Sequence, residues 1–221
     1  GYYSYWSNLP AKGFENFALP MRGCAMFPTN DGLTLLVGGW PMTEFEANKK
    51  DAEGNWMKIF DMHPELKERV AGAKRETKIF GTYVPNYFRK PYGPGWALVG
   101  DAGYNRDFIT AMGITDAFLS ADQVAEALDK SLGGAEPYNE TMAKYQYDRD
   151  ERVTPIFHFT CQLATCEPPS PETQQLFGAM AGNQEQMDKF AQVNSACLSP
   201  QNFFSEENIG KIFGAASARQ L

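Results

Sequence analysis

The stretch WALVGDAGYNRDFITAMGITDAF, residues 96–118, carries the most information in this chain. Its first four residues form a short apolar run that predicts a buried strand, and the strand ends in Gly100-Asp101. A loop leads to Gly113, from which apolar residues recur at helical spacing up to Leu128. The stretch therefore predicts a strand, a loop and a helix in succession.

This arrangement has a chemical consequence at each end of the loop. Glycine lets a ligand approach the backbone, and an aspartate at a strand end can accept hydrogen bonds from ligand hydroxyls. A helix start presents bare N–H groups and a positive dipole end, which stabilise negative charge. A flavin has both features, because its ribityl chain carries hydroxyls and its reduced ring is negative near N1. The dipeptide Gly-Asp alone, however, favours a plain turn.

The longer string resembles the second FAD-contacting motif of the aromatic-hydroxylase (group A flavin monooxygenase) family. In that family, strand–Gly-Asp-Ala is followed by a loop and then by a glycine at a helix start. The flanking segments are similar to a bacterial branch of FAD-dependent oxidoreductases, so the resemblance covers nearly the whole chain. These segments are residues 2–6, 27–32, 89–96, 161–165 and 181–184.

The resemblance implies two groups of cofactor contacts. The ribityl–pyrophosphate region of FAD would contact Gly100, Asp101 and Ala102. The isoalloxazine ring would lie near Thr110, Ala111, Met112, Gly113 and Ile114. Two residues depart from the family pattern: Tyr104 stands where many relatives have His, and Phe108 stands where many have Pro. The second departure would loosen the loop.

A further family motif is missing from the sequence. No Gly-x-Gly-x-x-Gly occurs, and Gly93-Pro94-Gly95 does not replace it because a proline interrupts it and a strand follows. In the family this fingerprint lies upstream and holds the ADP half of FAD. Because the chain also opens inside an aromatic strand pattern without Met, we expect it to be the carboxy-terminal part of a longer protein.

Outward from this stretch, the sequence predicts an α+β protein. Residues 1–42 favour strands, with a hairpin around Thr29–Gly32, and residues 75–85 favour another strand. Thr43 with Glu46 indicates a capping box and a helix start. The remainder is helical at about 136–165, 171–182, 184–194 and 206–213.

We therefore expect a mixed or antiparallel substrate-domain sheet, a carboxy-terminal helical region and an incomplete FAD/NAD(P)-binding-like fold. The expected division is a substrate-binding sheet with inserted helices at 1–96, a flavin-contacting strand–loop–helix at 97–132 and a helical region at 133–221.

Several aromatic residues are candidates to line a substrate pocket, because a sheet covers one side of the flavin in the family. They are Tyr3, Tyr5, Phe27, Trp40 and Tyr104. Packing in the core is the alternative for each of them. His63 and His158 favour structural positions over catalysis, and no acid or base stands out.

Composition narrows the classes of partner. The net charge is −7 and no basic run occurs, which argues against nucleic acid or an anionic membrane as partner. No apolar stretch approaches the ~20 residues of a membrane span, and no signal peptide is present, so a cytoplasmic location is expected. The four cysteines are scattered, which favours reduced structural thiols and no metal site.

The resemblance implies a flavin-dependent oxidoreductase, a monooxygenase that uses FAD and takes electrons from NAD(P)H. Its substrate would be a small organic molecule, with an aromatic compound as one candidate. Two alternatives remain open. The chain is a truncated binding or interaction module, or a separate amino-terminal chain or segment supplies the FAD-binding half of a split enzyme.

Overall fold

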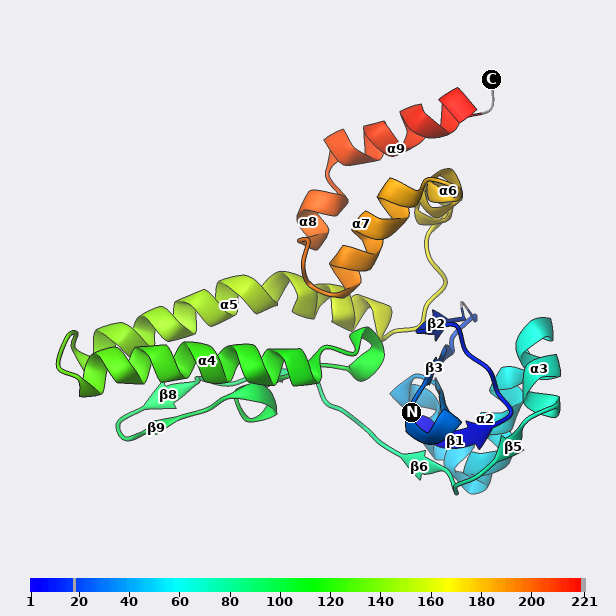
Figure 1. The fold of residues 1–221 in the computed structure, drawn as a ribbon, viewed down its shortest axis with the longest axis horizontal. Coiled ribbons are helices and arrows are strands. Elements are labelled where there is room, and N and C mark those ends of the chain that lie inside the picture. Colours follow the sequence, from blue (N-terminus) through cyan, green and yellow to red (C-terminus); the bar gives the residue numbers. More distant parts are fainter. Residues whose placement is uncertain (18, 220–221) are drawn as a thin grey trace. The chain divides into compact units, whose positions relative to one another are not determined.

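The computed structural model describes residues 1–17 and 19–219, and these form two compact units. The first unit contains residues 1–83 and 163–168, and the second contains residues 84–162 and 169–221. Helices and antiparallel strands are both present, so the expected α+β class is confirmed. Figure 1 shows the elements of each unit.

The first unit is an antiparallel sheet in the order β2-β3-β4-β1-β5, with β6 also paired to β1. The predicted hairpin is confirmed, because β3 and β4 pair from Gly23↔Gly39 to Pro28↔Thr34. Its turn contains Asp31 and Gly32 at φ of 57° and 71°. The strand bounds are β1 Tyr2–Ser7, β2 Glu15–Asn16, β3 Gly23–Pro28, β4 Thr34–Gly39, β5 Lys74–Arg75 and β6 Phe80–Gly81.

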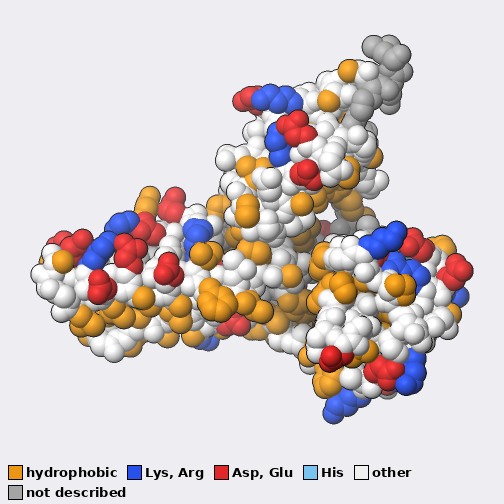
Figure 2. All heavy atoms as spheres, viewed as in Figure 1, with side chains coloured by type: hydrophobic (Ala, Val, Ile, Leu, Met, Phe, Trp, Pro, Cys, Tyr) orange, Lys and Arg blue, Asp and Glu red, His pale blue; other side chains and the backbone are white. Residues whose placement is uncertain are grey.

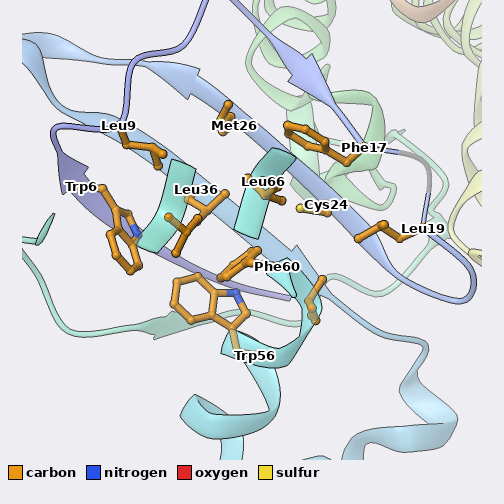
Figure 3. Packing of buried hydrophobic residues seen from close by; sticks show 12 residues of the cluster. Trp6, Leu9, Phe17, Leu19, Cys24, Met26, Leu36, Trp56, Phe60 and Leu66 are labelled. Carbon is orange, nitrogen blue, oxygen red and sulfur yellow. The ribbon is translucent and has the colours of Figure 1, made fainter. Parts of the chain in front are cut away.

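Alternation along these strands places the core on one face of the sheet. Trp6, Met26 and Leu36 are buried on that face. Helices α2 (Ala52–Phe60) and α3 (Pro64–Ala71) supply the facing side chains Trp56, Ile59, Phe60 and Leu66. Figure 3 shows this cluster between the strands and the two helices. The Trp56 indole also donates to the carbonyl of Tyr2 at 3.0 Å.

Two local predictions in this unit are wrong. The strand expected over 75–85 is only the short β5 and β6, because Thr77 bonds to β1 through its side chain: its Oγ1 accepts from the Tyr5 N–H at 3.1 Å. The capping box at Thr43 does not form: α1 (Phe45–Asn48) has no side-chain cap. Asp51 instead begins α2 by accepting from the Gly54 N–H at 3.0 Å.

The second unit is mainly helical. Its short strand pairs are β8 (Tyr92–Gly93) with β9 (Trp96–Ala97), and β7 (Tyr87–Phe88) with β10 (Tyr104–Asn105). Two long helices, α4 (Gly113–Leu132) and α5 (Tyr138–Leu163), run beside each other (Figure 1). The carboxy-terminal helices are α6 (Pro171–Met180), α7 (Gln184–Asn194), α8 (Pro200–Phe203) and α9 (Glu206–Arg219). They pack around Phe203 and Ile212.

The strand at residues 96–99 differs from the prediction. Only Trp96 and Ala97 pair, and Trp96 and Val99 are 45% and 37% exposed. Helix α4 begins at Gly113 as predicted, but most of its expected apolar face is exposed, with Ile114 at 77% and Phe118 at 73%. Figure 2 shows hydrophobic side chains gathered along α4. Each helix among the described residues is too short or too polar to span a bilayer.

Candidate functional site

Residues 98–112 form a compact turn structure between β9 and α4. The short 3-10 helix η4 (Gly100–Ala102) follows the strand, and a second, η5 (Phe108–Thr110), precedes α4. Asp107 begins η5, because its carboxylate accepts from the Ile109 N–H at 2.9 Å. Burial raises the pKa of the Asp107 carboxyl. Strand β10 lies between the two turns and pairs with β7, which fixes the loop in place.

Gly100 is buried and has φ of +53°, a conformation that favours glycine. A Cβ at this position would lie 3.0 Å from the Ala117 Cβ, and the Gly100 N–H donates to the Ser120 Oγ at 2.8 Å. The sequence suggested that this glycine opens the backbone to a ligand. In the structure its missing side chain lets α4 pack closely against the turn.

Asp101, the next residue, is exposed at the surface. Its backbone carbonyl accepts a hydrogen bond from the Tyr87 hydroxyl at 2.7 Å. Ala102 is also exposed, and its carbonyl accepts from the Arg89 guanidinium at 3.2 Å. The Asp101 carboxylate therefore faces solvent and is accessible to a ligand.

The start of α4 is open in the same way. The side chain of Met112, which precedes the helix, makes no capping bond. A Cβ placed on Gly113 would meet no heavy atom of the described residues within 4 Å. The N–H groups of this first turn, together with the positive end of the helix dipole, suit a negatively charged group.

The predicted ring contacts divide between surface and interior. Ala111, Gly113 and Ile114 are exposed, and Ala111 has φ of 53°. Thr110 and Met112 are buried, and the Thr110 Oγ1 lies 3.1 Å from the Thr160 Oγ1 of α5. The exposed members can contact a ligand, while the buried ones anchor the segment between them.

The predicted substrate residues fall into three groups. Tyr3, Tyr5 and Phe27 lie on the sheet face opposite the core, since β1 and β3 flank β4 there with Tyr5↔Leu35 and Phe27↔Leu35. Trp40 lies apart from them and packs against Tyr2, with ring centroids 5.4 Å apart.

Tyr104 lies in the second unit and is 2% exposed. Within the described residues its hydroxyl has no hydrogen-bond partner of ordinary geometry. Burial, followed by the nearby Asp116 carboxylate, raises its pKa.

Some residues that the sequence analysis did not select also contribute to the aromatic sheet face and to the start of α4. Phe80 of β6 stacks on Tyr3, with ring centroids 5.4 Å apart, and so extends the aromatic sheet face. Arg106 and Asp116 form a buried ion pair beside the start of α4, with Nη2 to Oδ2 at 2.7 Å. Phe80 belongs to an alternating apolar run and was detectable, whereas the pairing of Arg106 with Asp116 has no local signal.

Solved structures with the same architecture identify this fold. The flavin-dependent brominase Bmp2 matches with a TM-score of 0.74 and 16% identity over 99% of this chain and 55% of its own. PqsL, a probable FAD-dependent monooxygenase from Pseudomonas aeruginosa, matches with 0.64 and 21% identity over 74% and 47%. The myxobacterial FAD-dependent halogenase CndH matches with 0.63 and 22% identity over 97% and 54%.

The chain has a flavin monooxygenase-like fold. The resemblance carried by residues 96–118 predicted this fold, and the prediction is confirmed at the level of architecture. The chain spans about half the length of these structures. No family model and no curated protein matches the sequence.

Proposed function

We propose that the chain is the part of an FAD-dependent oxidoreductase, of the monooxygenase kind, that contacts the flavin ring and the substrate. The observation that carries the proposal is the pairing of an exposed carboxylate, Asp101, with an open and uncapped helix start at Gly113. The two lie at opposite ends of one short loop in a flavin monooxygenase-like fold.

The residues present fit a flavin. Asp101 would accept hydrogen bonds from the ribityl hydroxyls, with Gly100 and Ala102 beside it. Gly113 would present its N–H to the ring, with Thr110, Ala111, Met112 and Ile114 around it. When bound, FAD supplies the electron transfer, and the protein binds and orients the ring. The positive end of the α4 dipole favours the negatively charged, reduced ring over the neutral ring.

The half-buried aromatic sheet face supports a small organic substrate, and an aromatic one in particular. Tyr3, Tyr5 and Phe27 form this face with Phe80, and flat rings stack favourably on such side chains. In this proposal Trp40, at the edge of the core of the first unit, stays a candidate for substrate contact. Tyr104 of the second unit is 2% exposed and supports its loop from inside. NAD(P)H would supply the electrons.

A further part of the proposal concerns the ADP half of FAD. This chain spans about half the length of the similar flavin enzymes, and α4 exposes an apolar face. Both facts support an amino-terminal FAD-binding segment or a separate chain that supplies the nucleotide site. A truncated module without catalysis is the alternative, and it predicts no flavin binding at all.

Titration of the purified chain with FAD and with riboflavin, followed by flavin fluorescence, tests the proposal. If the chain holds only the ring side, riboflavin and FAD bind with dissociation constants within about tenfold of each other, which is about 1.4 kcal/mol. Asp101→Ala weakens both by about 10- to 100-fold, because it removes a hydrogen bond to a charged acceptor. The control is Asp122→Ala, an exposed carboxylate further along α4.

A second pair of variants tests the helix start. Gly113→Ala fills open space at the ligand and weakens flavin binding, while Gly178→Ala fills open space on α6 and leaves binding unchanged. A chain that binds neither flavin, or one in which Asp101→Ala and Asp122→Ala behave alike, contradicts the proposal. NADH and NADPH consumption with the added FAD-binding half then tests the electron donor.

A further inference from the structure

A buried charge pair lies beside the start of α4. Arg106 is 6% exposed and Asp116 is 5% exposed. The Nε and Nη2 atoms of Arg106 both donate to Asp116 Oδ2, at 3.1 and 2.7 Å. Because an isolated buried charge is very unfavourable, each of these groups depends on the other for its place in the interior.

The same arginine links the loop to α5. Its Nη1 donates to the Thr160 Oγ1 at 3.2 Å, and Thr160 in turn donates to the Ile156 carbonyl at 2.7 Å. The Thr110 Oγ1 lies 3.1 Å from the same Thr160 oxygen. Residues 111–115, which we call the helix-start segment, are therefore held at one end by Thr110 and at the other by Asp116.

The pair also has an electrostatic effect. Asp116 lies in the first turn of α4, where the helix dipole end is positive. Without compensation, its carboxylate would repel a negative group bound at that end, with an energy that grows as water is excluded. The positive guanidinium of Arg106 lies against this carboxylate and offsets its negative charge. The helix-start segment therefore keeps its preference for an anion.

We propose that Arg106 is a positioning residue for the flavin ring. It fixes the helix-start segment and cancels the charge of Asp116, so that the segment binds the reduced, anionic ring more tightly than the oxidised ring. This inference rests on the proposed function, and it adds residues that make no contact with the ring themselves.

The midpoint potential of the bound flavin measures this preference directly. Arg106→Gln leaves the Asp116 charge uncompensated, and the affinity for reduced flavin relative to oxidised flavin falls about tenfold, which is about 30 mV for a two-electron couple. Asp116→Asn leaves the arginine charge uncompensated and moves the potential upward. Arg106→Lys keeps the charge and stays near the wild-type value.

One further variant separates the effect of position from the effect of charge, and a second serves as a control. Thr160→Val removes the hydroxyl shared by Arg106 and Thr110 without changing any charge. Hydrogen exchange should become faster in residues 110–116, and oxidised and reduced flavin should both bind more weakly by the same factor. Arg69→Gln is the control, because it breaks the ion pair with Glu15 in the other compact unit and leaves the potential unchanged.

The opposite directions of the two charge variants are decisive, since a general loosening of the fold would move both potentials the same way. Equal or absent shifts overturn the inference, and so does unchanged exchange in Thr160→Val. If Arg106→Gln does not fold, the inference is tested by the upward shift of the potential in Asp116→Asn and by the faster hydrogen exchange in Thr160→Val. A wild-type chain that binds no flavin contradicts the proposed function first, and the inference falls with it.

Discussion

Cys24 lies in the core of the antiparallel sheet, and burial raises the pKa of its thiol to about 12 from the ordinary value of 9.0. The folded state therefore holds the proton more tightly than the unfolded state. The resulting contribution to the free energy of unfolding is complete below pH 9 and is lost as the pH rises toward 12. At pH 10.5 the loss is about 2 kcal/mol.

The measurement is urea unfolding of the wild type and of Cys24→Ala at pH 8 and pH 10.5. The free energy of unfolding of the wild type should fall more steeply than that of the variant. Tyr104 and Tyr145, whose pKa values burial also raises, act equally in both proteins and cancel in the difference. Parallel pH dependences in the two proteins would show that the thiol is solvated.

Single residues also show which parts of the candidate site the sequence could predict. Asp101 lies at the surface and Gly113 starts a helix in open space, and both positions depend on local backbone that the pattern specifies. Their contacts with a flavin stay predictions. Gly100 lacks a side chain for a reason of packing against Ala117, and that reason is tertiary. The contacts of Arg106 with Asp116 and Thr160 join residues 10 and 54 positions apart, which local patterns do not reveal.

Among the elements, α4 shows the limit of periodicity. Its bounds agree with the helical spacing, yet its buried residues are Asp116, Ser120 and Ala127, while Ile114 and Phe118 are exposed. Periodicity specifies that one face is apolar, and only the neighbouring elements decide what covers that face. The hairpin β3–β4 was predictable because its turn and its alternation are local. The segment 75–85 was not, because the Thr77 side chain replaces part of the ladder.

The exposed face of α4 gives a prediction about stability. Phe118→Ala should change the free energy of unfolding by less than about 0.5 kcal/mol, because the ring is solvated in this chain. Met142→Ala on α5 is the matched comparison, and it should cost about 2–5 kcal/mol because that side chain is fully buried. Chemical denaturation measures both. An equal cost for the two variants would mean that α4 is covered in solution.

At the scale of the whole molecule, the two compact units have separate cores. Trp6, Trp40 and Trp56 lie in the first unit, so tryptophan fluorescence reports mainly on it. The long helices α4 and α5 lie almost wholly in the second unit, so far-ultraviolet circular dichroism reports mainly on that unit. The two signals can therefore follow the units separately during unfolding.

Two matched core variants test whether the units unfold independently. Ile59 and Ile156 are 2% and 3% exposed, one in each unit. Ile59→Ala should lower the denaturation midpoint seen by fluorescence, and Ile156→Ala the midpoint seen by dichroism, each at a cost of about 2–5 kcal/mol. If either substitution moves both midpoints equally, the molecule unfolds as one cooperative body.

The first unit includes a short segment, residues 163–168, that comes much later in the sequence. After α5 the backbone returns at residues 163–168, where the Cys166 carbonyl accepts from the Met21 N–H at 3.0 Å. Genetic recombination at a single crossover would exchange residues 1–83 and leave this returning piece with its old neighbours. Exchanging the first unit alone between two proteins of this architecture would therefore require three crossovers, after residues 83, 162 and 168.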